Sequence, residues 1–389
     1  MLNRSQVSRV VLTNYKSIKH CDVILGPLTF LVGPNGAGKS NFVEAIRFLS
    51  YALSGSLEQA VENRGGFQSI AHRGDEIAST ITFQLLLDLA EVGKAQYDVE
   101  IRAVEDGPAV VAAEGCSVDR PSGREWFRVE EGVVSGSNRG VMPTASEDKL
   151  YLVNASGLAP FEPVYRALSN ITVYNPLPEE IRGFKSAKRY RNLDRSGSAL
   201  AEIISKMKDA APDRLARVYD YLERINPNVM GVDPVSVDAN FNLRFKLKRG
   251  NGHSQDFLAN NISDGTLRAL AVLVALFQNS DRYPLNFIGL EEPEAGLHPA
   301  AAGVLFDSLV EGSTMRQIVV TSHSPDLLDR EDIPVGALKA VTMKSGCTII
   351  GEVDQAARTA LRERLYTVGE LMRMGQLRPE NPNSIGGIV

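Results

Sequence analysis

The residues best suited to chemistry lie in the segment Gly33-Pro34-Asn35-Gly36-Ala37-Gly38-Lys39-Ser40-Asn41. It fits the pattern G-x-x-x-x-G-K-S, in which glycines let backbone N–H groups turn toward phosphate oxygens. The apolar run Phe30–Val32 precedes it, and an amphipathic helix follows, whose N-terminus adds a positive dipole end. This context argues against a chance glycine-rich turn. We predict a loop that binds ATP, with Lys39 on the β- and γ-phosphates and the Ser40 hydroxyl on Mg²⁺.

Three later segments could complete a nucleotide site. Ser263-Asp264-Gly265 opens a predicted helix and offers N–H donors and a hydroxyl for a phosphate, although an ordinary N-cap explains it about as well. The apolar strand from Leu285 ends in Glu291 and Glu292, which suits Mg²⁺ binding and general-base catalysis. The alternative for these acids is a solvated strand end. The strand from Gln317 ends at His323, and a lone histidine is more often structural.

The order of these four segments resembles that of ABC-type ATPases, and in particular the RecF/SMC/OLD group. Short bacterial ATPases of this group carry the same motifs, here Ile262–Arg268, Glu291–Pro299 and Thr321–Pro325. The opening Asn14–Ile18 and the late Val368–Leu371 also match. The resemblance is specific over residues 9–52 and 260–330 and loose elsewhere.

The resemblance implies a role for each motif residue. Glu292 would polarise the attacking water, and His323 would contact the γ-phosphate. The loop Ser263-Asp264-Gly265 would bind the γ-phosphate of a nucleotide held by the other subunit. Glu291 stands where the group usually has Asp, so its metal role is expected with a geometry altered by one methylene.

The glutamine that this group places in its Q-loop is not assigned by the sequence. Gln68 and Gln84 are both available, and neither lies in a convincing context.

The elements that must position these residues alternate between strand and helix at both ends of the chain. The pattern predicts strands at 9–12, 22–25, 28–32, 80–87, 97–103, two around 235–248, and from 285, from 317 and near 340; it predicts helices at 40–52, near 200–225, from 265 and from 299. We expect an α/β fold, an ABC-type ATPase head with a mixed sheet, an antiparallel lobe and an inserted lateral subdomain.

The expected organisation has four parts. An N-terminal ATPase lobe spans residues 1–115, an insertion 116–200, a C-terminal ATPase lobe 201–350, and a helical tail 351–389. Glycine, serine and proline punctuate 117–140, and 146–154 is typical of a linker. About 250 residues separate Lys39 from Glu292, which indicates that a sizeable segment interrupts the ATPase fold. The tail is expected to pack as a helix pair or to dock a partner protein.

Composition limits the function classes. The net charge of −5 excludes a globally basic DNA-coating protein, and the longest apolar run, Ala269–Phe277, is too short to span a membrane. Cys21, Cys116 and Cys347 are scattered, so we expect reduced thiols in a soluble, cytoplasmic protein without membrane contact.

A basic stretch lies in the expected insertion. Aromatic residues interleave with its cations, which could contact the phosphate backbone of DNA; the alternative is a solvated face or a protein contact. The cations in question are Arg182, Lys185, Lys188, Arg189 and Arg191, followed by Arg195.

Together these features predict a homodimer, or a higher oligomer, that closes around ATP and opens after hydrolysis, acting on DNA or controlling an effector in genome maintenance or phage defence. We find no acidic set typical of a TOPRIM nuclease, so a separate nuclease-like partner is expected. One rival is an ATP-binding scaffold with negligible turnover. A transporter ATPase is disfavoured by the interrupted fold.

Overall fold

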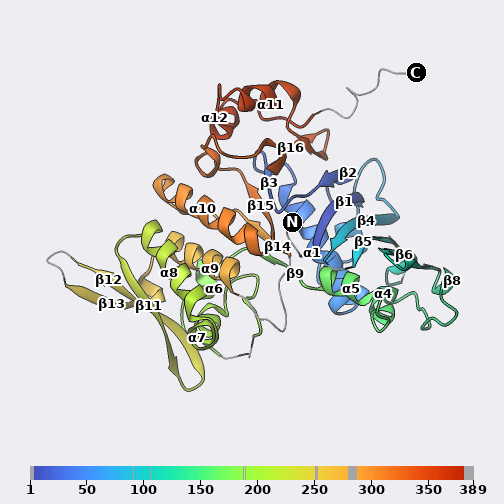
Figure 1. Cartoon of the computed structure of the whole chain (residues 1–389), viewed down its shortest axis with the longest axis horizontal. Coiled ribbons are helices and arrows are strands. Elements are labelled where there is room, and N and C mark those ends of the chain that lie inside the picture. The colour runs from blue at the N-terminus through green and yellow to red at the C-terminus, as the bar shows by residue number, and fades with distance from the viewer. Residues whose placement is uncertain are drawn as a thin grey trace. The chain divides into compact units, whose positions relative to one another are not determined.

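The computed structural model describes residues 4–90, 92–105, 107–186, 188, 190–249, 253–278 and 287–380. The chain forms two compact units, and its ribbon is drawn in Figure 1. Unit 1 comprises residues 1–171, 334–362 and 375–389, and unit 2 comprises 172–333 and 363–374. No helix among the described residues is long and apolar enough to cross a bilayer.

Unit 1 is built on an antiparallel sheet of seven strands (Figure 1). In spatial order the strands are β2 (Ile18–Ile24), β1 (Gln6–Tyr15), β4 (Thr80–Leu89), β5 (Gly93–Arg102), β6 (Val110–Arg120), β7 (Gly123–Glu130) and β8 (Val133–Ser137). Side chains of β4 alternate between buried and half-buried, as expected for a sheet with one covered face. The antiparallel lobe expected from the sequence is therefore confirmed.

The helix that follows the glycine-rich loop covers part of this sheet. Phe48 of α1 (Lys39–Ser54) stacks on Phe83 of β4 with ring centroids 5.8 Å apart, and Tyr15 of β1 lies edge-on to Phe83. The other helices of unit 1 are α2 (Leu57–Glu62), α3 (Phe67–Ile70), α4 (Tyr151–Ala155), α5 (Glu162–Ser169) and α11 (Gln355–Arg362).

A C-terminal hairpin also belongs to unit 1. Its strand β16 (Leu338–Lys344) pairs in parallel with β3 (Leu28–Val32) and antiparallel with β17 (Cys347–Glu352). Parallel and antiparallel pairings thus occur side by side, as the expected mixed sheet requires.

The region expected to form an insertion differs from the prediction. Strand β6 runs through the boundary expected at residue 115, and 116–137 complete the antiparallel sheet as β6 to β8. Tyr151–Ala155, placed in a linker by its polar surroundings, is the short helix α4. Pro121 and Ser122 lie in the turn between β6 and β7, and Gly132 lies in the turn between β7 and β8, where turn-forming residues are needed.

A buried carboxyl joins β6 to α4. Oε1 of Glu114 accepts from the Tyr97 hydroxyl at 2.9 Å and from the Leu152 amide at 2.7 Å, and Oε2 accepts from the Tyr151 amide at 2.5 Å. Burial raises the pKa of the Glu114 carboxyl to about 7, against the effect of these three donors.

Unit 2 contains a four-stranded antiparallel sheet and a parallel strand pair. Helix α9, nearly all of it buried, packs against α8 and α10, and Tyr221 of α8 stacks on Phe277 of α9 at 5.7 Å. The strands are β10 (Lys185–Ser186), β11 (Val229–Val237), β12 (Asn240–Lys248), β13 (Ser254–Leu258), β14 (Phe287–Glu291) and β15 (Gln317–Ser322), with β9 (Ile171–Tyr174) at the unit boundary in the sequence. The helices are α6 (Pro178–Ile181), α7 (Leu200–Ala210), α8 (Pro212–Ile225), α9 (Asp264–Phe277), α10 (Pro299–Met315) and α12 (Val368–Arg373).

Most predicted elements near the motifs are confirmed. The helix expected from Pro299 and the strand expected from Gln317 begin at those residues. The strand expected from Leu285 is described from Phe287, because Leu285 lies outside the described residues. The C-terminal tail contains two short helices, α11 and α12, which belong to different units, so the packing of a C-terminal helix pair stays a prediction.

The buried Glu114 carboxyl predicts a pH-dependent stability. Its pKa of about 7 exceeds the ordinary 4.5 of an unfolded chain, so the folded protein binds more protons between these values. The free energy of unfolding should therefore fall by about 3 kcal/mol as pH rises from 4.5 to 7. Glu114→Gln cannot ionise and should lose this slope, measured by urea unfolding with the single tryptophan, Trp126 of β7, as the probe.

Glu62→Gln, on the exposed side of α2, is the matched control and should keep the wild-type slope. The same pH dependence in Glu114→Gln and wild-type protein would contradict this account.

Candidate functional site

The glycine-rich loop of unit 1 contains two glycines in the left-handed region. It connects β3 to α1, and Gly36 and Gly38 have φ values of 75° and 97°, in the left-handed region that favours glycine. Pro34, Asn35, Gly36 and Ser40 are exposed, whereas Ala37 and Lys39 are buried.

Lys39 is held inside the curve of this loop. Its ammonium donates to the carbonyl oxygens of Gly33 at 2.8 Å and Pro34 at 3.0 Å, and the residue is 5% exposed. These two hydrogen bonds hold the Lys39 ammonium against the backbone of the loop, where the motif predicts a lysine that contacts phosphate.

Two other segments of unit 1 press against the loop. A Cβ at Gly33 would lie 2.0 Å from the Val341 carbonyl oxygen of β16, and a Cβ at Gly38 would lie 1.9 Å from the Thr348 hydroxyl of β17. Glycine is required at both positions because the hairpin backbone and a buried side chain occupy that space.

A directed chain of hydrogen bonds connects these segments. The Asn41 amide donates to the Ser17 hydroxyl at 2.7 Å, Ser17 lies 2.7 Å from the Thr348 hydroxyl, and Thr348 donates to the Ala37 carbonyl at 2.9 Å. Because the single hydroxyl proton of Thr348 is donated to the Ala37 carbonyl, the Ser17 hydroxyl must donate to Thr348. The sequence singled out Asn14–Ile18 as a matching motif but did not predict this contact, and Thr348 carried no signal.

In unit 2, parallel pairing brings the predicted acids and histidine together. Strand β14 pairs with β15 in a register that places Glu291 opposite Thr321, so both strands end at one edge of the sheet. There Oε1 of Glu292 lies 3.1 Å from Nδ1 of His323, with both side chains more than one-third exposed. Glu292 has a left-handed φ of 44°, which turns the chain out of the strand.

Glu291 is more enclosed and has an arginine partner. Its side chain is 11% exposed, and Oε1 accepts from the Arg195 guanidinium at 2.7 Å. The neighbouring Asp194 fixes the turn that contains Arg195. Its carboxylate accepts from the hydroxyls of Ser196 and Ser198 and from the Ala199 amide at the start of α7. The sequence counted Arg195 only as part of a basic stretch, since nothing in its spacing indicated Glu291.

The loop Ser263-Asp264-Gly265 lies against the turn that follows the acidic strand. Ser263 is the N-cap of α9, so the ordinary capping role is confirmed, and both Ser263 and Asp264 remain exposed. A Cβ on Gly265 would lie 2.1 Å from the Gly296 carbonyl oxygen. Two of the motifs predicted separately thus meet within unit 2.

The basic stretch bonds largely to acids of its own unit. Arg182 donates to Asp264 at 2.5 Å and to the Ile262 carbonyl at 2.8 Å, and Lys185 pairs with Glu180 at 3.3 Å. Lys188 and Arg191 are exposed, and Arg189 lies outside the described residues. The DNA contact proposed for this stretch remains a prediction.

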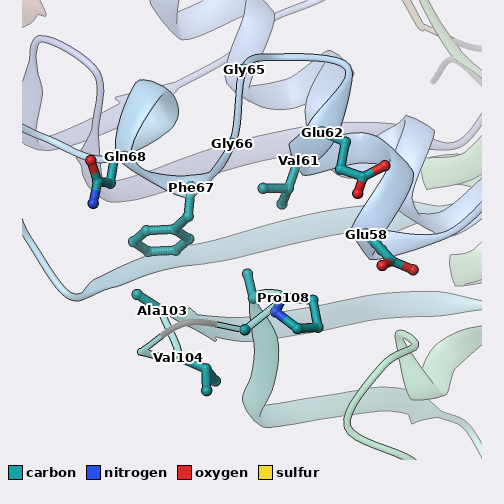
Figure 2. Close-up of a pocket in the computed structure, with 12 residues that line it drawn as sticks. Glu58, Val61, Glu62, Gly65, Gly66, Phe67, Gln68, Ala103, Val104 and Pro108 are labelled. Carbon is teal, nitrogen blue, oxygen red and sulfur yellow. The ribbon is translucent and has the colours of Figure 1, made fainter.

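The two glutamines considered for the Q-loop have different surroundings. Gln84 of β4 donates to Asp98 of β5 at 2.8 Å, so its amide is already engaged. Gln68 is exposed and lines a pocket of about 640 Å³ in unit 1 together with Val61, Phe67 and Pro108 (Figure 2).

The comparison with known families decides the identity. A family model described as "AAA domain, putative AbiEii toxin, Type IV TA system" matches residues 28–107 and 150–329, more than half of the chain. The chain belongs to this family. This AAA-domain protein also has curated relatives. It is 43% identical to the DNA replication and repair protein RecF of Vibrio vulnificus strain YJ016, over 49 residues that make up 12% of this chain and 14% of RecF.

Old nuclease of Escherichia phage P2 matches over a longer stretch, with 24% identity over 362 residues, 83% of this chain and 57% of that protein. The chain thus spans less than two thirds of these relatives. Among solved structures, the Smc head domain of Pyrococcus furiosus, bound to the C-terminal domain of ScpA, superposes with a TM-score of 0.52 at 12% identity, covering 93% of this chain and 99% of that one. The AAA-domain protein is an ABC-type P-loop ATPase of the RecF/SMC/OLD group with the fold of an SMC head.

Thr348→Val should weaken ATP binding about tenfold, because it removes the donor to Ala37 and the acceptor for Ser17 while keeping the side-chain shape. The dissociation constant of a fluorescent ATP analogue is the measurement. Thr314→Val, which removes an exposed hydroxyl of α10, is the control and should bind as wild type. Wild-type affinity in a folded Thr348→Val protein would show that the hydrogen-bond chain does not position the loop.

Proposed function

We propose that this protein binds ATP with Mg²⁺ and hydrolyses it, and that two copies close when ATP is bound and open after hydrolysis. The observation that carries the proposal is the Glu292–His323 pair at the end of the parallel strands. Hydrolysis by this chemistry needs a phosphate-binding loop and a general base, and the chain offers a candidate for each.

The proposed roles follow the chemistry of each residue. Gly33 to Asn41 bind the phosphates, with Lys39 as the cation. Glu292 takes the proton of the attacking water, and His323 donates toward the γ-phosphate. The exposed loop Ser263-Asp264-Gly265 meets the nucleotide of the second copy.

The residues present suit Mg²⁺. Ser40 and Glu291 offer a hydroxyl and a carboxylate oxygen, the ligand type this ion prefers. The bound ion would neutralise phosphate charge, and Arg195 would orient the Glu291 carboxylate.

The biological role we propose is action on DNA or control of an effector in the cytoplasm, in genome maintenance or in defence against phage. The similarity to RecF and to Old nuclease supports it. A separately encoded TOPRIM-like nuclease is the effector we expect. The second candidate function is an ATP-binding scaffold without turnover, which the partly exposed Glu292–His323 pair disfavours.

Glu292→Gln keeps the shape of the side chain but removes the base, so hydrolysis should fall by a factor of about 10² or more while ATP still binds. Closed dimers should then accumulate with Mg-ATP. The measurements are phosphate release and the molar mass by light scattering. Lys39→Ala is the matched control: it should lose ATP binding and remain at the nucleotide-free mass.

Undiminished hydrolysis in Glu292→Gln would remove this residue from the reaction. A mass that does not change with Mg-ATP, in a variant shown to bind ATP, would contradict nucleotide-driven association. ATP binding by wild-type protein with no phosphate release would favour the scaffold.

Lys188→Ala combined with Arg191→Ala should weaken DNA binding and reduce the slope of log affinity against log salt by about 2, because fewer counterions are released. These two are chosen because Arg182 and Arg195 bond to motif residues. The measurement is fluorescence anisotropy of a labelled duplex at several salt concentrations. The pair Lys246→Ala and Lys248→Ala, exposed on β12, is the control. An unchanged slope would leave the stretch as a solvated face or a protein contact.

A further inference from the structure

A third glutamate of the acidic strand end has no part in the proposed chemistry. Glu294 lies in the turn after β14 and is 7% exposed. Its Oε1 accepts from the Ser322 hydroxyl at 2.5 Å, and its Oε2 has no hydrogen-bond partner among the described residues. Burial raises the pKa of the Glu294 carboxyl.

Ser322 is the residue immediately before His323 and is fully buried at the end of β15. Its hydroxyl donates to Glu294 and accepts from the Ser324 amide at 3.1 Å. One oxygen is thus bonded to the turn of β14 and to the residue that follows His323, which limits the positions that the His323 backbone can take.

A second contact connects the same two turns. The Glu292 amide donates to the Thr321 carbonyl at 3.0 Å, with the Thr321 hydroxyl at 3.3 Å. Glu292 is therefore fixed through Thr321, and His323 is fixed through Ser322 and Glu294.

The contact between the Glu292 and His323 side chains is too exposed to fix their positions by itself. These side chains are 37% and 39% exposed, and ion pairs with this exposure contribute little to stability. A hydrogen bond to a buried carboxyl is stronger, because water does not compete for the donor and the acceptor.

We infer that Glu294 is a positioning residue: its buried carboxyl holds Ser322 and thereby sets the distance between Glu292 and His323. This inference rests on the proposed function, in which that pair acts on the attacking water and the γ-phosphate. Glu294 itself touches neither.

The test compares Glu294→Leu, Glu294→Gln and Ser322→Ala. Loss of the Glu294–Ser322 hydrogen bond, the clamp, should lower kcat for ATP by about tenfold or more in Glu294→Leu and Ser322→Ala. KM for ATP should change less than about twofold, because the glycine-rich loop is untouched. Glu294→Gln keeps an acceptor oxygen and should retain most of the activity. The double variant Glu294→Leu/Ser322→Ala should be no slower than the slower single variant, because both changes remove one interaction.

Ser308→Ala is the matched control. It removes another fully buried hydroxyl of unit 2, one that donates to the Leu305 carbonyl within α10, and should leave kcat unchanged. If Glu294→Leu does not fold, Ser322→Ala decides the question, because it removes a single oxygen atom.

A second readout does not need hydrolysis. The chain has five histidines, and the ring protons of each give NMR signals whose chemical shifts report its surroundings. At fixed pH, the His323 ring signals should shift in Ser322→Ala and Glu294→Leu, as the distance to Glu292 changes, while those of the other four stay in place. If wild-type protein shows no ATPase activity, the proposed function fails and this NMR comparison still tests the Glu294–Ser322 contact. Wild-type kcat, or wild-type His323 signals, in folded Ser322→Ala would overturn the inference.

Discussion

The parallel pairing of β14 with β15 is the constraint on which the candidate chemistry of unit 2 depends. Parallel strands end at the same edge of a sheet, and the register places Glu291 opposite Thr321. The residues just beyond, Glu292 and His323, consequently meet although about 30 residues separate them. A shift of one residue would turn each side chain to the other face of the sheet. Helix α10 packs on β15, and all residues of both strands are buried.

In unit 1, close backbone packing positions the glycine-rich loop. The glycine-rich loop is shaped by its own glycines, but its surroundings come from segments distant in the sequence, near Ser17, Val341 and Thr348. The turn at Ser17 and the hairpin β16–β17 approach so closely that Gly33 and Gly38 have no room for a side chain. The C-terminal hairpin is therefore part of the framework of the loop, in addition to completing a sheet.

Two arginines of the basic stretch in unit 2 form ion pairs with acids of the predicted motifs. Arg182 bonds to Asp264 and Arg195 bonds to Glu291, so two cations of the basic stretch neutralise acids of the nucleotide motifs. An arginine can orient a carboxylate as well as neutralise it, because its donors are fixed in a plane. The stretch between α6 and α7 is thereby connected to the motif loop at α9 and to the end of β14.

The sequence alone predicted the glycine-rich loop, the strand-end acids and histidine as candidate site residues, and most of the helices and strands around them. Each is a local pattern, because glycine conformation, helix capping and strand alternation are decided by residues a few positions apart. The tertiary structure alone decided the Arg195–Glu291 pair, the Ser17–Thr348 hydrogen bond, the Glu294–Ser322 clamp and the membership of β6 to β8 in one sheet. The three side-chain contacts join residues far apart in the chain, and Thr348 has no spacing that distinguishes it from an ordinary core position. Ser322 lies in a predicted motif, but nothing in the sequence shows that its hydroxyl meets Glu294. Strands β6 to β8 are neighbours in the chain, and their turn-forming residues resembled those of a linker. The roles of these residues follow from which strands pair and in what register, and that is set by the burial of the whole fold.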